Sequence, residues 1–173
     1  VVPRALELSA DVKAGQRIYE MRCDKCHGIQ GPGQGRYEPY EPRARVPALW
    51  GSNSFTKGAQ GMYTVPLLAH LVKMFMPLGK ANLKVQEAID VAGFINSQKR
   101  DMGYATETFF GGDDPETGVP NAFFKPSYFP VGVPVPGDPF SFKQRLLGPW
   151  QPIEDWQAEQ RQLWTGENPG EPR

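Results

Sequence analysis

The chain has 173 residues, of which 39% are hydrophobic, and 19 Lys and Arg residues balance 19 Asp and Glu residues. A formal net charge of zero argues against a nucleic-acid partner, and no apolar run reaches the roughly 18 residues that a membrane-spanning helix needs. The charge is uneven along the chain: residues 1–100 carry 14 basic against 8 acidic side chains, and residues 101–173 carry 5 against 11. This split predicts two zones, a compact domain over 1–100 and an extension over 101–173.

The first predicted helix begins after Ser9, a residue type that favours the N-cap position, and runs into Cys23. Ile18 and Tyr19 belong to an apolar stripe along it. Gly15 lies four positions before Tyr19, on about the same face. A residue without a side chain at that point allows a second helix to cross closely.

The stretch Cys23-Asp24-Lys25-Cys26-His27 follows directly. Two thiols at this spacing with a histidine behind the second form the attachment signal of a c-type haem, in which His27 supplies its imidazole to the iron. A zinc site lacks ligands, because the chain has no other cysteine and only His70 as a further histidine. A thioredoxin-like pair expects a βαβ context, and an inert surface pair leaves His27 unexplained. The motif therefore predicts one covalently bound haem c.

The compartment follows from the haem, because covalent attachment of this kind takes place outside the cytoplasmic membrane. We therefore predict a periplasmic protein, or one otherwise outside that membrane. The chain starts at Val1 without a basic-then-apolar leader, so we expect that any signal peptide has been removed.

Residues 28–47 are rich in Gly, Pro, Arg and Glu, and they are expected to form an ordered loop along one edge of the haem. A second helix is predicted from Val65 or Pro66 to about Phe75. Its leucines and valines are spaced for burial, and proline is well tolerated in a first helical turn.

A third helix is predicted from about Lys84 to Gln98. Gly93 in its middle costs about 1 kcal/mol relative to alanine, which close helix packing would explain. We therefore expect this helix to cross the first one, with Gly15, Tyr19, Gly93 and Phe94 near the crossing.

From Asp101 onwards the composition changes, and most of the chain's 18 prolines lie in this last part. Closely spaced prolines exclude regular helix and the interior of a sheet. The same segment is rich in Phe and Trp, whereas disordered linkers are poor in aromatic residues. We therefore predict an extended arm lying on a protein surface, its own or a partner's, followed by a short helix near residues 153–164.

A c-type haem in an electron carrier normally has a second protein ligand, most often Met or His. The candidates are Met21, Met62, Met74, Met76, Met102 and His70. Met21 is too close to Cys23 to reach the opposite face of the ring. Pro77 pushes Met76 out of helical geometry into a loop, which frees its side chain to face the iron. Met76 is the predicted ligand, with Met74 the close rival and His70 the main alternative to a methionine.

The order of helix, attachment motif, loop, helix, Met-Pro and helix resembles a class I cytochrome c domain. Five stretches are similar to the C-terminal haem domain of the tetrathionate-forming thiosulfate dehydrogenases: residues 46–51, 54–55, 58–59, 76–79 and 86–97. The weaker stretch 148–153 is similar to the end of those chains. The resemblance covers about residues 10–100 well and the remainder patchily. It implies an all-α class I domain with a long, mostly irregular extension.

The same resemblance implies that His27 and Met76 are the two axial ligands. Those enzymes carry two haems and do their substrate chemistry at the other one, whose domain is missing here. The resemblance therefore implies only the electron-accepting half, and we predict no catalytic residue.

The leading hypothesis is a monohaem c-type cytochrome that transfers one electron at a time, as the cytochrome subunit of a periplasmic oxidoreductase or electron-transport complex, with sulfur-compound oxidation as a candidate setting. Its expected partner is a redox protein, a dehydrogenase or an electron-transport complex, docked through the 101–173 arm. The alternative is a haem enzyme of the thiosulfate dehydrogenase type with an exchangeable sixth ligand. In a third hypothesis the chain is a structural subunit whose aromatic tail matters most. Carbon monoxide binding separates the first two.

Overall fold

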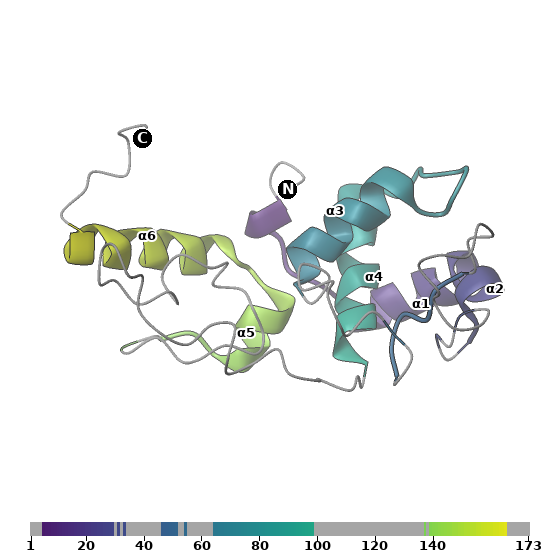
Figure 1. Ribbon diagram of the computed structural model, residues 1–173, viewed down its shortest axis with the longest axis horizontal. Helices are drawn as coiled ribbons and strands as arrows, with labels where there is room; N and C mark the ends of the chain where they lie inside the picture. Colours follow the sequence, from purple (N-terminus) through teal and green to yellow (C-terminus); the bar gives the residue numbers. More distant parts are fainter. Residues whose placement is uncertain are drawn as a thin grey trace, which may run out of the picture.

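The computed structural model describes residues 5–29, 31, 33, 46–51, 54, 64–98, 137 and 139–165. Within these ranges every regular element is a helix, as Figure 1 shows. The elements are η1 (Ala5–Glu7), α1 (Val12–Arg22), α2 (Asp24–His27), α3 (Val65–Phe75), α4 (Val85–Ser97), α5 (Phe142–Leu147) and α6 (Gln151–Thr165). The all-α prediction is confirmed, and helices α3 and α4 have nearly the predicted bounds. None of the described helices is both long and apolar enough to cross a membrane.

Helix α1 begins after Asp11, so the prediction that Ser9 is its N-cap was wrong. The Asp11 carboxylate accepts hydrogen bonds from the backbone N–H groups of Lys13 at 2.9 Å and Ala14 at 3.0 Å. The bond from Ala14 is the main reason that the pKa of Asp11 lies below its usual value. The backbone N–H of Asp11 in turn donates to the buried Asp90 side chain at 2.9 Å. This contact with α4 fixes where α1 starts.

Helices α1 and α4 cross in close contact at Gly15. A Cβ atom built on Gly15 would overlap the backbone carbonyl of Asp90 and lie 2.9 Å from the Cβ of Phe94. The rings of Tyr19 and Phe94 lie 5.4 Å apart between their centroids. The predicted crossing is therefore confirmed for these residues.

Gly93 makes a different contact from the one predicted. A Cβ atom on Gly93 would lie 2.5 Å from the Cβ of Ala10 and 3.7 Å from Cδ2 of Leu147. The close approach at this glycine is thus to the segment before α1 and to α5. Gly93 therefore leaves room for Ala10 and Leu147 to pack on α4.

The core lies between α1, α3 and α4, and it also contains part of the C-terminal segment. Ile89 of α4, Trp150 and Ile153 all have 0% of their surface exposed and belong to one cluster. The backbone N–H of Trp150 donates to the Leu6 carbonyl at 2.8 Å. The backbone N–H of Ala10 donates to the Leu147 carbonyl at 2.7 Å, so residues 147–150 run beside residues 6–10.

The C-terminal segment is more helical than its proline content predicts. The short helix predicted near 153–164 is present as α6, but α5 was not expected. Helix α5 lies in a stretch without proline, and the Ser141 hydroxyl caps it by accepting from the Gln144 N–H at 3.2 Å. Much of the predicted arm lies outside the described residues, and the division at residue 100 stays a prediction.

Replacing Trp150 with alanine is expected to lower the free energy of unfolding by about 3–5 kcal/mol, because the side chain is fully buried and its removal leaves a cavity. Guanidinium denaturation followed by far-ultraviolet circular dichroism measures the change. Trp156→Ala is the matched control, since this ring is only partly buried and meets Phe140 edge-on at 6.0 Å. Equal effects of the two substitutions would contradict a core role for Trp150.

Candidate functional site

The two cysteines and His27 lie on a single helical turn at the junction of α1 and α2. The N–H of Cys23 donates to the Tyr19 carbonyl at 2.8 Å and closes α1. The N–H groups of Cys26 and His27 both donate to the Cys23 carbonyl, at 3.1 and 2.9 Å. Figure 1 shows that α2, which carries Cys26 and His27, lies at the end of the molecule opposite α6.

Both sulfur atoms are free thiols; Cys26 is exposed and Cys23 is partly buried. Burial raises the pKa of the Cys23 thiol to about 11. A redox-active cysteine pair needs a thiolate, which a lowered pKa provides. The raised pKa therefore argues against a thioredoxin-like site. Among the described residues there is also no cluster of three or more His, Cys, Asp and Glu side chains that could hold a metal ion.

His27 is buried, with 9% of its surface exposed, and its Nδ1 atom lies 2.9 Å from the Pro47 carbonyl oxygen. A carbonyl oxygen can only accept, so Nδ1 carries the hydrogen, and Nε2 is the ring nitrogen that a metal could bind. Metal-ligating histidines are typically fixed in this way by a backbone carbonyl behind the ring. The donor set and its orientation fit a haem iron. No sequence pattern indicates the role of Pro47, because an accepting backbone carbonyl has no sequence signature.

The chain after His27 is tied down by further hydrogen bonds. The Tyr19 hydroxyl donates to the Gly28 carbonyl at 2.6 Å, and the Gly33 N–H donates to the His27 carbonyl at 2.9 Å. Gly31 has a positive φ of 64°, and a Cβ atom on it would lie 2.5 Å from the Trp50 ring. Most of the predicted haem-edge loop, residues 28–47, lies outside the described residues.

Three aromatic rings connect this turn to the core. The ring centroids of Tyr19 and Trp50 are 5.1 Å apart, and those of Trp50 and Phe94 are 5.7 Å apart, edge to face. Burial raises the pKa of Tyr19, so its hydroxyl stays protonated and able to donate. The Tyr19 hydroxyl, bonded to the Gly28 carbonyl, thus ties the residue after His27 to this ring cluster of α1 and α4.

Met76 is the residue at which α3 ends. Its backbone is extended, with φ −115° and ψ 146°, as expected for a residue before proline. Its side chain is partly buried against the core. Pro77 begins the loop that leads to α4.

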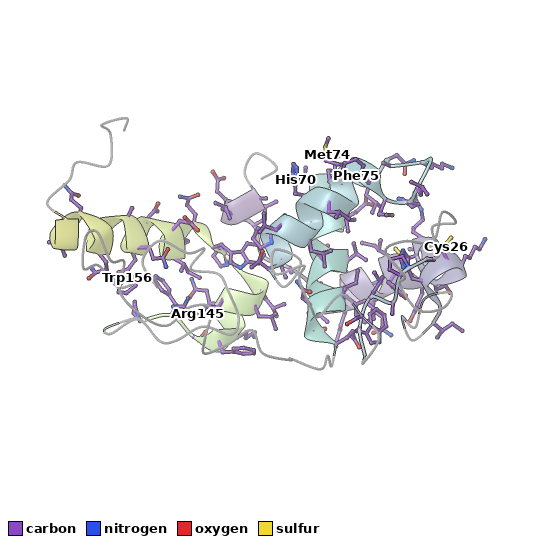
Figure 2. The ribbon with its side chains drawn as sticks, viewed as in Figure 1. Cys26, His70, Met74, Phe75, Arg145 and Trp156 are labelled. Atoms are coloured by element: carbon purple, nitrogen blue, oxygen red, sulfur yellow. The ribbon has the colours of Figure 1, made fainter. Side chains whose placement is uncertain are left out.

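The two main rivals of Met76 lie elsewhere on α3. Figure 2 shows Met74 and His70 on the outer side of α3, pointing away from Cys26. Met74 is 56% exposed, and Nδ1 of His70 is buried without a hydrogen-bond partner among the residues that the structure describes. Met62 and Met102 lie outside the described residues. The geometry favours Met76, and its role as an iron ligand stays a prediction.

The family model described as Cytochrome c matches residues 12–99. A thiosulfate dehydrogenase of Stutzerimonas stutzeri is 40% identical over 91 residues, covering 52% of this chain and 28% of that protein. A thiosulfate dehydrogenase of Allochromatium vinosum is 39% identical over 102 residues, covering 56% and 35%.

Among solved structures, the thiosulfate dehydrogenase TsdBA of Marichromatium purpuratum matches 72% of this chain and 25% of its own, with 33% identity and a TM-score of 0.48. The chain therefore spans at most about a third of the length of these relatives.

Proposed function

Because this chain belongs to the cytochrome c family, whose model matches residues 12–99, we propose that it is a carrier of single electrons with one covalently bound haem c. The family implies the haem and electron transfer. The number of haems, the attachment and the ligands are our proposal. Cys23 and Cys26 would hold the porphyrin, and His27 and Met76 would occupy the two axial positions of the iron.

The observation that carries the proposal is the orientation of His27. The Pro47 carbonyl oxygen lies 2.9 Å from Nδ1 and accepts its hydrogen, and the two cysteines lie on the same helical turn as His27. When bound, the haem supplies an iron that gains and loses one electron. Cys23, Cys26 and His27 would hold the ring in place, and with Met76 as a second ligand the iron would have no open position for a substrate.

The alternative is a haem enzyme of the thiosulfate dehydrogenase type with an exchangeable sixth ligand. The relatives are named thiosulfate dehydrogenases, which is the reason to test this alternative. Carbon monoxide is expected to change the reduced absorption spectrum of the chain very little, because His27 and Met76 would both bind the iron and leave no position for the gas. Titration of the reduced chain with carbon monoxide at neutral pH measures the spectral change. Met76→Ala is the positive control, because this variant should bind the gas. Rapid stoichiometric binding to the unaltered chain would support the enzyme.

We also propose a redox partner, a dehydrogenase or an electron-transport complex, that docks through residues 101–173, and a location outside the cytoplasmic membrane. The relatives' names support a setting in sulfur-compound oxidation. Trp150 and Ile153 have no exposed surface. These two side chains therefore serve the core, and docking falls to other parts of the arm.

Replacing residues 101–136 with a Gly/Ser linker of equal length is expected to leave a folded chain that holds its haem, because the helices of the core and Trp150 are retained. The altered chain should no longer co-purify with its redox partner. Absorption spectra show whether the altered chain holds its haem. The control is the unaltered chain, with which the partner should co-purify. Unchanged co-purification would show that this segment is not the docking element. Loss of folding would show that it belongs to the domain.

A further inference from the structure

A hydrogen bond joins the end of α1 to the loop that follows Met76. Arg22 is the last residue of α1 and directly precedes Cys23. Its Nη2 atom donates to Oδ1 of Asn82 at 2.6 Å. This is a short bond with a charged donor, and such bonds are stronger than those between neutral groups. It connects the segments that carry the two predicted iron ligands.

The loop over residues 76–84, called here the Met76 loop, is anchored at both ends. At its start the Met76 N–H donates to the Val72 carbonyl at 2.9 Å. At its end Leu83 is buried, with 2% of its surface exposed, and the Lys84 N–H donates to Glu87 Oε2 at 2.6 Å. These anchors belong to α3, the core and α4.

The middle of the Met76 loop is held much less firmly. Residues 78–82 are all exposed, and Leu78 has 86% of its surface exposed. The hydrogen bonds from Lys80 N–H to the Pro77 carbonyl and from Asn82 N–H to the Lys80 carbonyl, at 2.8 and 2.9 Å, are local to the loop. Among the described residues, the bond to Arg22 is the one that ties this exposed stretch to another element.

We propose that Arg22 is a positioning residue for the sixth iron ligand, acting through Asn82. The inference rests on the proposed function, in which Met76 binds the iron. The hydrogen bond holds the Met76 loop against the end of α1 that bears Cys23, and so keeps the methionine on the iron. Without this bond the loop opens more often and the sixth position is free for a larger fraction of the time.

Arg22 also brings a positive charge close to the attachment site, and this second effect must be separated from the first. Burial raises the pKa of Cys23, and the guanidinium of Arg22 partly offsets that rise, which places the cation near this thiol. Asn82→Ala removes the hydrogen bond and keeps the charge. Arg22→Ala removes both. Arg17→Ala removes an exposed cation from the same helix without touching the loop.

Imidazole titration of the oxidised, haem-loaded chain measures the opening, because imidazole binds the iron only when the methionine has left it. We expect Asn82→Ala and Arg22→Ala each to raise the apparent imidazole affinity by roughly 3- to 10-fold. This range corresponds to the loss of one charge-assisted hydrogen bond, whose contribution is reduced because the bond is exposed to solvent. The double variant should match the single ones, because both remove the same bond. Arg17→Ala should leave the affinity unchanged.

Met76→Ala separates failure of this inference from failure of the proposed ligand. It should raise the affinity far more than either loop variant. If it does so while Asn82→Ala stays within twofold of the unaltered chain, the positioning role is overturned and the ligand stands. If the imidazole affinity rises with Arg22→Ala but not with Asn82→Ala, Arg22 acts through its charge alone. That result also overturns the proposal. No effect of Met76→Ala refutes both. Circular dichroism of each variant confirms that it is folded.

Discussion

We expect the chain, when it is produced in cells that attach c-type haem, to have an intact mass increased by that of one haem. Acid–acetone extraction should leave the colour on the protein. Replacing both Cys23 and Cys26 with alanine should abolish covalent attachment completely, because the chain has no other cysteine. This is the largest effect that the proposed site predicts, since the attachment depends on two sulfur atoms alone.

Single replacements provide the matched controls for that result. Cys23→Ala and Cys26→Ala each leave one thiol on the turn, so some covalent haem should remain with each. The partly buried Cys23 and the exposed Cys26 are the two free thiols. Haem that extracts from the unaltered chain, or an intact mass without added haem, would refute the proposed function at its base.

Replacing Met76 with alanine is expected to abolish the weak near-infrared-edge absorption band of a methionine bound to oxidised iron. The reduction potential should also fall by a substantial part of the roughly 0.8 V range that axial ligands control, because a methionine ligand raises the potential of a c-type haem. Absorption spectra of the oxidised protein and a potentiometric titration measure the two changes.

Two neighbours on α3 serve as controls for Met76. Met74→Ala and His70→Ala should keep the band and the potential, because both side chains lie on the outer side of α3 in Figure 2. Loss of the band in Met74→Ala would transfer the role of ligand to that residue. Retention of the band in Met76→Ala would show that Met76 does not bind the iron.

The local parts of the fold follow from neighbouring residues, and sequence reasoning predicts them. The apolar spacing of α3 and α4 indicates their bounds, and Pro77 predicts the extended backbone seen at Met76. The missing side chain of Gly15 predicts the close crossing of α1 and α4, where the Asp90 carbonyl fills the space. In each case the deciding interaction lies within one element or is set by one residue type.

The features that the sequence analysis missed depend on residues far apart in the chain. Ser9 and Asp11 are both good N-caps, and the contact from Asp90 selects Asp11. Nothing near Trp150 indicates that its N–H binds the Leu6 carbonyl. The same holds for His27 and the Pro47 carbonyl, since any residue type can offer that acceptor. Long-range backbone contacts thus set the limit of prediction for this chain.

The pairing of residues 6–10 with residues 147–150 has a consequence for the order of folding. The α1–α4 crossing joins residues of the first hundred positions, so it can form before Trp150 reaches the core. The bond between Leu6 and Trp150 closes nearly the whole chain into one loop, and contacts of such wide sequence separation form slowly. A chain in which Trp150 has not yet docked therefore has its attachment motif but an incomplete core. Completion of the core is expected to be a late step in folding.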